Sequence, residues 1–555
     1  MVGIRVYNQW LDTDQGSGFS YTQSSPLFIG GEMDKITAAF SSDIKLPLTQ
    51  RNKTILDYPD ELDNHNRLMV DMSCELYVNG FFLNEGELTV TNVSSDTITV
   101  KIVINPYKLL RDIQLEGLDL DSYDFDTVED IVAHALATAT TPMSYNHAFF
   151  PVYNPGFIEG TVVTDDYLFK YFQNPWDYLA QTFAEGETSI KGVTPFIRLD
   201  YLIGKIITRL GFVVDNQFQI TDELKQIYLY NNKSLVKGST WGTTVNLKHH
   251  VPDVLATHLL KWYTKRFCLV NEIDFTTRTW TIRKINDIMD RAETDDWTDK
   301  AMEDYSLESD NYTPSRVGDM QDSYRDVSTY VEVDSYEDIE TTPSDSKIYW
   351  VKSRGAYYYK LMSTPFLIIT EYVRELRKVR VEVNGNDEFQ SEMTALQSKW
   401  IELLGAGLFD QFQEATWPGY VDGLTQGENP GLRVMMYRGL MPSRMMPSYD
   451  YPLATNNNYD TFEEQIAGAE WSLTWDGEKG IYEKLWKNWL FFLTNRKIVK
   501  RRLLLNLSDI VNFRWEKKVR IGNMLYFCNE MKVNFTASPD NKVEVEAELS
   551  TLILT

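Results

Sequence analysis

Histidine, cysteine and carboxylate side chains are the residues here that could bind a metal or act as acids and bases. Three of the six histidines lie close together in the sequence, at His249, His250 and His258. Zinc-protease motifs place two histidines four positions apart on a helix, with a glutamate beside the first. His250 and His258 are separated by 258 − 250 = 8 positions, and no glutamate follows either of them. The spacing therefore does not indicate a metal centre.

The cysteines do not form a recognisable motif. Only Cys74, Cys268 and Cys528 occur, in odd number and far apart, so they define neither a disulfide framework nor a CxxC metal site. This usage is typical of a chain that folds in a reducing cytoplasm.

An acidic segment precedes a stretch with helical periodicity. Its carboxylates are Glu116, Asp119, Asp121, Asp124, Asp126, Glu129 and Asp130. An EF-hand calcium loop needs Asp or Asn at alternating positions and a central glycine. The fifth and sixth positions here are Tyr123 and Asp124, so the pattern fails. We expect a solvated acidic turn that leads into a helix over 128–139.

Other motifs of catalysis and cofactor binding are also missing from the sequence. Gly405-Ala406-Gly407 is followed by Asp410 where a dinucleotide-binding loop needs its third glycine. No GxSxG, P-loop or HExxH pattern occurs. We therefore predict that the protein is not an enzyme, with no catalytic, cofactor-binding or metal-binding residues. A carboxylate pair for glycan hydrolysis remains the alternative, because sequence does not reveal carboxylate separation.

Composition indicates an ordinary globular chain with a strong acidic excess. With 555 residues, about 150 residues per domain suggests three or four domains. Aromatic residues reach 13%, which favours β-structure and large interfaces. The net charge is 54 − 80 = −26, which disfavours binding to nucleic-acid phosphates. Such charge serves solubility, or it lines a passage through which DNA slides without adhering.

Nothing in the sequence predicts a membrane span or a secretion signal. The N-terminal stretch 1–8 lacks the apolar core of a signal peptide. The longest apolar runs, including 366–369 and 489–493, are far shorter than the ~18 residues that a helix needs to cross a bilayer.

The N-terminal region reads as a β-barrel or sandwich over 1–110. Apolar strands are predicted at 36–40, 44–46, 68–78, 81–83, 88–90 and 98–104. Asn79-Gly80 between two of them is a strong hairpin signal, because both residues tolerate positive φ.

Further regions follow in an order that suggests inserted domains. An acidic and aromatic connector with one helix spans 111–164, and an α+β domain spans 165–292 with helices at 199–210 and 254–267 and strands at 268–273 and 279–283. A second acidic connector occupies 293–346. A mixed β/α domain spans 347–470, with a helix over 389–404, a strand over 432–436 and a loop over 442–458.

The most strongly patterned stretch is 471–527, in the last region, 471–555. It predicts a strand over 471–475, an amphipathic helix over 481–493, a basic connector over 496–502 and a hairpin around Gly522-Asn523. The hairpins at 76–83 and 519–527 are alike, and alternating strands follow both. We therefore expect 517–549 to complete a second barrel with the helix packed beside it. The predicted fold class is β-rich, multidomain α+β, with tube-like β-barrel or sandwich domains and inserted α+β units.

Several stretches together resemble tail proteins of Bacteroidota phages and prophages. They are Val193–Arg198 followed by Leu202–Gly211, Val251–Val254, Phe275–Ile282 and Leu473–Glu483 with the closing hairpin. The segments 36–48 and 76–90 are similar in style to baseplate-hub and tail-tip proteins. The resemblance spans most of the chain, is weakest over 300–430, and offers no active-site residues to carry over.

The resemblance implies a virion structural protein, a tail-tip or baseplate-hub subunit that connects the tail tube to distal components around the DNA passage. Its implied partners are further copies of itself in a ring of three, with six as the alternative, the tail tube or other tail proteins, and tail fibres. DNA would pass transiently without specific binding. Two related barrels per chain would let three copies present six tube-like units. The implied location is the virion tail, after folding and assembly in the bacterial host cytoplasm. Alternatives are a tail-associated cell-wall hydrolase and an adhesin, although the adhesin's fibre repeats are missing from the sequence.

Overall fold

The computed structural model describes most of the chain. The described residues are 2–14, 18–27, 39–61, 70–104, 110, 113–153, 172–174, 176–177, 180–183, 193–231, 233, 235–237, 240–241, 244–309, 331–335, 338, 348–353, 356–360, 367–372, 381–383, 387–389, 393–395, 399–404, 415–417, 432–442, 450–455, 458, 465–473, 478–535 and 542–552.

The chain folds into two compact units, each made from segments that are distant in sequence. Unit 1 contains Met1–Arg111, Cys268–Pro314 and Asn488–Thr555, whereas unit 2 contains Asp112–Phe267 and Ser315–Lys487. Both ends of the chain therefore contribute to the same unit.

Unit 1 is built mainly from strands. They are β1 (Val2–Val6), β2 (Gln9–Trp10), β3 (Phe19–Ser24), β4 (Ala39–Ser41), β5 (Ile44–Pro47), β6 (Asp71–Val78), β7 (Phe81–Val93), β8 (Thr97–Ile104), β21 (Leu269–Asp274), β22 (Thr279–Lys284), β23 (Thr294–Asp296), β24 (Ala301–Ser309), β36 (Lys497–Asn506), β37 (Lys518–Ile521), β38 (Met524–Phe535) and β39 (Lys542–Thr551). Its short helices are α1 (Gln50–Ile55), α7 (Ile285–Met289), η7 (Thr298–Lys300) and α10 (Leu507–Val511).

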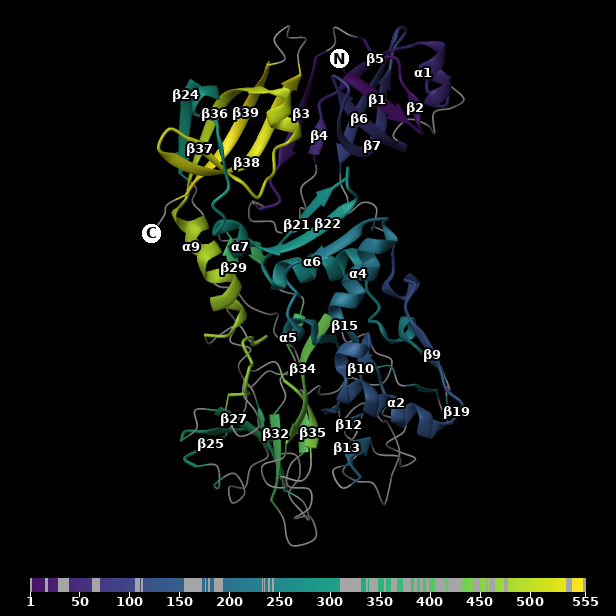
Figure 1. Cartoon of the computed structure of the whole chain (residues 1–555), viewed down its shortest axis with the longest axis vertical. Coiled ribbons are helices and arrows are strands. Elements are labelled where there is room, and N and C mark those ends of the chain that lie inside the picture. Colours follow the sequence, from purple (N-terminus) through teal and green to yellow (C-terminus); the bar gives the residue numbers. More distant parts are fainter. Residues whose placement is uncertain are drawn as a thin grey trace. The chain divides into compact units, whose positions relative to one another are not determined.

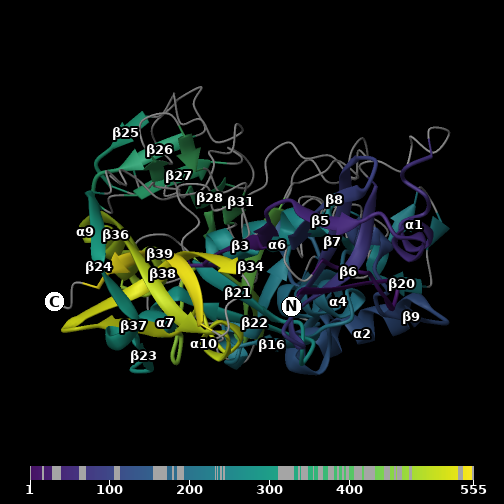
Figure 2. The same ribbon diagram turned by 90° about the horizontal axis from the view of Figure 1, so that it is seen from above.

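Fourteen of these strands form one sheet, whose C-terminal half is seen from two directions in Figures 1 and 2. The order is β2-β1-β6-β7-β8-β4-β3-β38-β39-β36-β24, with β5 paired to β8 and β37 joined to β38 and β23. The sheet curls around a core of buried side chains that come from both ends of the sequence, such as Leu88, Val100, Leu503 and Val545. This is the β-rich fold class that the sequence predicts.

The first predicted hairpin is confirmed. Alternate residues of β6 are buried, as its period-2 pattern requires. The two-residue turn to β7 has φ +49 at Asn79 and +85 at Gly80, and positive φ at both positions matches the twist of the flanking strands. The strand predicted over 88–90 is the far half of β7 and not a separate element.

The second hairpin, between β37 and β38, is confirmed as well. Ile521 pairs with Met524 across the turn, and of the two turn residues Gly522 alone has a positive φ, +61. The two hairpins thus share their two-residue loop but differ in turn type. Ile521 and Phe527 are both buried, and β38, β39 and β36 continue the sheet.

The basic connector predicted over 496–502 is wrong, because most of it is strand β36. Val499, Leu503 and Leu505 enter the core, while Lys500 and Arg502 alternate with them on the outer face. β36 pairs with β39 on one side and with β24 on the other. Charges on the outer face of a strand do not oppose its formation when the other face is buried.

The acidic stretch that begins at 293 also contributes strands. Its residues form β23, which runs parallel to β37, and β24, which pairs antiparallel to β36. Asp304 and Glu308 of β24 face basic side chains of β36, and backbone pairing with β37 and β36 explains why this acidic stretch forms strands.

The predicted amphipathic helix over 481–493 is confirmed. It consists of a π-helical turn, η9 (Tyr482–Trp486), followed by α9 (Lys487–Asn495). Within unit 1, Trp489 stacks on Phe492 at a centroid distance of 5.2 Å. Phe492 meets the buried Phe527 of β38 edge-on at 5.7 Å, so the helix packs beside the C-terminal strands as expected.

Unit 2 combines helices with several small sheets. Its strands are β9 (Ser122–Asp124), β10 (His147–Ala148), β11 (Val152–Tyr153), β12 (Phe172–Gln173), β13 (Trp176–Asp177), β14 (Thr182–Phe183), β15 (Phe196–Arg198), β16 (Val213–Asn216), β17 (Ile227–Leu229), β18 (Val236–Lys237), β19 (Thr240–Trp241), β20 (Thr244–Asn246), β25 (Val331–Val333), β26 (Ile348–Val351), β27 (Ala356–Lys360), β28 (Leu367–Tyr372), β29 (Val381–Val383), β30 (Asp387–Phe389), β31 (Met393–Ala395), β32 (Lys399–Leu404), β33 (Ala415–Trp417), β34 (Leu432–Pro442) and β35 (Asp450–Ala454). Its helices are η3 (Leu115–Gly117), α2 (Val128–Thr140), η4 (Pro142–Ser144), α4 (Leu199–Arg209), α5 (Asp222–Lys225), η6 (Leu247–His250) and α6 (Ala256–Arg266).

Two six-stranded sheets organise unit 2. One has the order β10-β15-β17-β34-β31 with β35 on β34, and the other has the order β25-β26-β27-β28-β32-β33. The predicted helices at 128–139, 199–210 and 254–267 are confirmed as α2, α4 and α6, and in unit 1 the predicted hairpin at 268–283 is confirmed as β21 and β22. Gly211 follows α4 with φ +80, as a helix C-cap requires.

Three predicted elements in the second half of the chain are wrong. The helix over 389–404 is replaced by β31 and β32, and β32 pairs with β28. Periodicity alone does not separate short buried helices from strands. Here, pairing with a neighbouring strand determines that the segment is a strand. The loop over 442–458 contains β35, which extends the hairpin from β34. Residues 471–473 do not form a strand, and the remainder of that predicted strand, 474–475, lies outside the described residues.

Candidate functional site

The outer face of the C-terminal strands carries a dense set of paired charges, here called the charged face. Its members are Asp304 and Glu308 of β24, Lys500 and Arg502 of β36, Glu544, Glu546 and Glu548 of β39, and Glu530 and Lys532 of β38. Strand register sets them in rows, because Glu548 lies opposite both Lys500 and Glu530, and Glu546 opposite both Arg502 and Lys532. Opposite side chains of neighbouring strands lie on the same face.

Acidic and basic groups pair across the strands of the charged face. Lys500 lies 3.0 Å from Glu308, and Arg502 lies 2.8 Å from Asp304. Lys532 lies 3.1 Å from Glu546. The hydrogen bond to Glu308 raises the pKa of Lys500, so the ammonium stays charged. Exposed pairs of this kind contribute no more than about 1 kcal/mol each, so they orient side chains more than they stabilise the unit.

The charged face keeps a negative excess after this pairing. The three basic groups and six carboxylates named above have a formal charge of 3 − 6 = −3, and Lys542, exposed on the same face of β39, reduces the excess to −3 + 1 = −2. The charged face lacks the cluster of lysines and arginines that binding to nucleic-acid phosphates needs. Chemically, it can repel a polyanion at close range.

In the N-terminal half of the same sheet, two carboxylates meet across neighbouring strands. Glu75 of β6 lies directly opposite Glu85 of β7. Arg5 donates to Glu75 at 2.5 Å, and Arg278 donates to Glu85 at 2.6 Å. Burial raises the pKa of Glu75, but hydrogen bonds from Arg5 and Tyr77 outweigh burial and lower it. Burial raises the pKa of Glu85. Each carboxylate is thus held by a guanidinium, an arrangement that fixes the strands.

The histidines considered from sequence do not share one environment. His250, in η6, is buried and its Nδ1 lies 2.9 Å from the carbonyl oxygen of Lys233. His249 and His258 are exposed. Within the described part of the chain, no three His, Cys, Asp or Glu side chains gather where they could hold a metal ion.

A different histidine pair is brought together, and the sequence analysis missed it. His134 of α2 and His147 of β10 approach to 2.9 Å between their Nε2 atoms. They lie 13 positions apart on a helix and on the strand that follows it. The feature of the sequence that could have pointed to this pair is the group of aromatic residues near it, Tyr123, Phe125 and Tyr145, whose rings lie close to His134.

The three cysteines are all free and buried. Burial raises the pKa of the Cys74 thiol to about 12, and it also raises the pKa of Cys268 and Cys528. Each thiol is therefore protonated at neutral pH and unreactive.

The acidic segment before α2 serves local structure. The Thr127 and Asp130 side chains form a reciprocal capping box at the start of the helix. Asp124 accepts a hydrogen bond from Thr244 at 2.6 Å. The predicted acidic turn into a helix is therefore confirmed. The turn at 405–407 with Asp410 lies outside the described residues.

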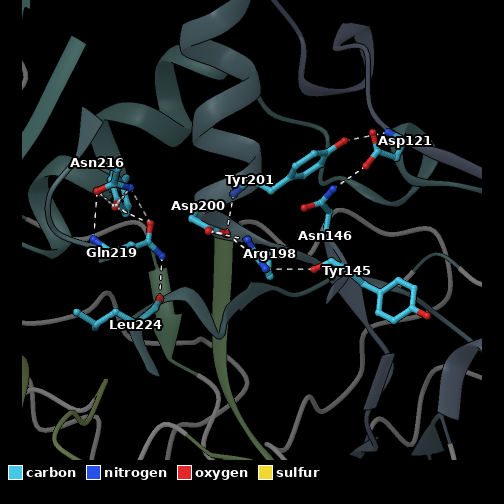
Figure 3. Close-up of polar contacts among 10 residues, drawn as sticks. Asp121, Tyr145, Asn146, Arg198, Asp200, Tyr201, Asn216, Gln219 and Leu224 are labelled. Atoms are coloured by element: carbon cyan, nitrogen blue, oxygen red, sulfur yellow. Dashed lines mark hydrogen bonds and ion pairs between the residues drawn. The ribbon is translucent and has the colours of Figure 1, made fainter. Parts of the chain in front are cut away.

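A polar network in unit 2 fixes the junction between β15 and α4 (Figure 3). Arg198 binds the carboxylate of Asp200 through two hydrogen bonds of 2.9 and 2.8 Å. Asn146 donates to Asp121 at 2.7 Å, and the hydroxyl of Tyr201 accepts from the Asp121 backbone at 2.9 Å. The network links three segments and leaves its charges paired, which is typical of a structural role.

A second polar group in the same view holds the chain between β16 and α5. The amide of Gln219 donates to the Leu224 carbonyl oxygen at 2.9 Å, and Asn216 donates to Gln219 at 3.1 Å (Figure 3). The buried Tyr263 hydroxyl donates to Gln219 at 2.7 Å. These contacts satisfy buried polar atoms and position α6.

Comparisons with known proteins give limited similarity. No family model and no curated protein matches the sequence. Among solved structures, a prophage MuSo2 43 kDa tail protein from Shewanella oneidensis is 6% identical with a TM-score of 0.34, over 99% of this chain and 97% of the other. A tail protein from Neisseria meningitidis MC58 is 8% identical with a TM-score of 0.32, over 99% and 95%. At these values the similarity shows neither a common fold nor a common function.

No described helix combines the length and the apolar composition that a bilayer crossing needs.

Proposed function

We propose that this chain is a structural subunit of a phage-type tail, placed at the tail tip or baseplate hub. The observation that carries the proposal is the sheet of unit 1. Two hairpin modules from opposite ends of the sequence join there into one curled sheet through β3 and β38. A pair of β-modules in one chain is what the sequence resemblance to tail-hub proteins leads one to expect.

The presence of two β-modules in one chain has a consequence for symmetry. If each copy supplies two similar modules, three copies present six, and a threefold tip can meet a sixfold tube. Most soluble oligomers consist of identical subunits with closed point-group symmetry, and a ring is one such arrangement. We therefore propose a homo-oligomeric ring of three copies, with six as the alternative, bound to the tail tube on one side and to fibres on the other.

The charged face suggests how DNA would be handled. Its excess of carboxylates supports a role as a lining that DNA passes without adhering, because phosphates are repelled where basic clusters are missing. The protein's task would then be mechanical and would need no catalytic group. The proposed location is the virion tail, after folding in the bacterial host cytoplasm.

Cryo-electron microscopy and mass measurement of the purified protein test this proposal. We expect a ring with threefold or sixfold symmetry and a central channel. A protein that stays monomeric at high concentration and is missing from purified virions would overturn it.

The competing function is a cell-wall hydrolase. A zymogram on host cell walls separates the two functions, because a structural hub leaves the substrate intact. A cleared zone that disappears in the Glu75→Gln or Glu85→Gln variant would favour the hydrolase.

A further inference from the structure

The imidazoles of His134 and His147 form a closed pair within unit 2. Their Nε2 atoms lie 2.9 Å apart and their ring centroids 5.0 Å apart. His147 is fully buried, and its Nδ1 has no hydrogen-bond partner among the described residues. A single proton lies between the two Nε2 atoms, since one nitrogen must donate and the other must accept.

The buried Nδ1 of His147 decides the arrangement of that proton. Buried N–H groups without an acceptor are rarer in proteins than buried acceptors without a donor, so this nitrogen is assigned no proton. His147 therefore carries its proton on Nε2 and donates to Nε2 of His134. His134 is half-buried and carries its own proton on Nδ1.

This arrangement penalises a second proton at either ring. His134 can accept one only at Nε2, which would bring two N–H groups face to face at 2.9 Å. His147 can accept one only at Nδ1, inside the protein, where no described residue accepts it. Either protonation event favours separation of the two rings.

We propose that the His134–His147 pair is an acid-sensitive latch that holds the N-terminal half of α2 against β10. The C-terminal half of α2 has separate attachments. The Phe149 backbone N–H donates to Thr138 at 3.2 Å, and the Tyr437 hydroxyl donates to the Ala139 carbonyl oxygen at 2.8 Å. When the latch opens, the first turns of α2 keep only the burial of Ile131 and Val132 and loosen, while the last turns stay in place.

Among the described residues, the groups around the pair do not supply a compensating negative charge. The described titratable groups that face it are Tyr123 of β9, Tyr145 and His250 of η6, and the charge of His250 opposes protonation of His147. The charged groups on the neighbouring elements are engaged elsewhere. They are Asp121 with Asn146, Asp130 with Thr127, Lys233 with the Val251 carbonyl oxygen, Arg198 with Asp200, and Arg438 with Glu223.

Aromatic rings give the open state a favourable place for the charge. The rings of Tyr123, Phe125 and Tyr145 lie 5.1, 4.9 and 5.2 Å from His134. Aromatic faces attract a cation, so a charged His134 that has turned away from His147 remains stabilised among them. The depressed pKa of both imidazoles, which follows from burial, agrees with the geometry.

The test uses the full-length protein with isotope-labelled histidine, in the presence of EDTA. With six histidines in the chain, ring-nitrogen NMR spectra can be assigned by single substitutions. At pH 7.5 we expect His147 as the Nε2–H tautomer and His134 as the Nδ1–H tautomer. On acidification both rings should become charged together. A His134 ring that titrates by itself while His147 stays neutral and bonded would overturn the proposal.

Hydrogen exchange measured by mass spectrometry gives a second readout. After correction for intrinsic rates, exchange in 128–136 should rise more than about tenfold per pH unit below pH 6, because opening takes up two protons. In the His134→Gln variant, which keeps a hydrogen bond but cannot titrate at 134, the rise should be tenfold or less. His258→Gln, at an exposed position on α6, should behave like the wild type. Equal pH dependence in all three proteins would overturn the latch.

Discussion

The ring of Phe19 stacks on the ring of Phe535 at a centroid distance of 5.0 Å and an interplanar angle of 28°. The two residues are directly opposite each other in the pairing of β3 with β38. This contact joins the N-terminal and C-terminal modules of unit 1 across 535 − 19 = 516 positions of the chain. The integrity of the curled sheet therefore depends on residues near both ends of the sequence.

Truncation of Phe535 should destabilise unit 1 strongly. Phe535→Ala removes a buried ring and should cost about 3 kcal/mol of unfolding free energy. In a double-mutant cycle with Phe19→Ala, the coupling should be about 1 kcal/mol, the typical value for an aromatic pair. Urea unfolding of the four proteins measures both quantities. Phe40→Ala on β4, where the ring is 41% exposed, is the control and should cost much less. Strictly additive effects would contradict the stacking.

The turn between β6 and β7 should be sensitive to a side chain at its second residue. Gly80 has φ +85 and open space around it, so Gly80→Ala tests backbone conformation without a steric clash. We expect a loss of about 1 kcal/mol in unfolding free energy. Gly117→Ala, at a position with equally open space and no positive φ, should be close to neutral. Thermal or urea unfolding of the two variants measures these changes in unfolding free energy. An equal loss in both variants would show that the positive φ is not the cause.

Local patterns predicted the long helices and the two hairpins, because their causes lie within a few residues. The Asn79-Gly80 turn, the apolar face of α4 and the alternation in β8 each specify an element without reference to the remainder of the chain. The errors occurred where a distant partner decides. The segment that forms β36 was predicted to be a basic connector. It is a strand because β24 and β39 pair with its backbone and with its charges.

The same distinction applies to the candidate sites. The charged face is spread over four strands, so no short motif contains it. The His134–His147 pair depends on how α2 packs on β10, and the spacing of 13 residues has no standard meaning. His249, His250 and His258 are close together in the sequence, but the fold does not bring them into one site.

Reversal of the charge on the charged face should cause the protein to bind DNA. Replacing Glu544, Glu546 and Glu548 by lysine changes the formal charge by six, from −2 to +4 when Lys542 on the same face is counted. We expect the variant to retain double-stranded DNA at low salt and to release it as salt rises, as phosphate contacts do. Anisotropy with a labelled duplex measures this binding.

The control for charge reversal is a triple variant in which the net charge changes by the same amount at another location. Glu116, Asp119 and Asp126 are exposed in unit 2, and lysine at these three positions should give weaker binding because the positive charges do not form one flat array. Equal binding by both triple variants would mean that net charge alone matters, and the proposed lining role would lose its support.

Acid should destabilise unit 2 through its buried histidines. Burial lowers the pKa of His250 to about 3, and the imidazole of an unfolded chain titrates near 6.5. The unfolded state therefore binds more protons between these values, so stability is full above pH 6.5 and falls as pH drops toward 3. His250 alone should reduce the unfolding free energy by about 2 kcal/mol between pH 6.5 and pH 5.

Denaturant unfolding at several pH values should show a flatter profile for His250→Asn than for the wild type. His249→Asn, at the adjacent exposed position, should leave the profile unchanged, and a flattened profile in that control would assign the effect to surface charge.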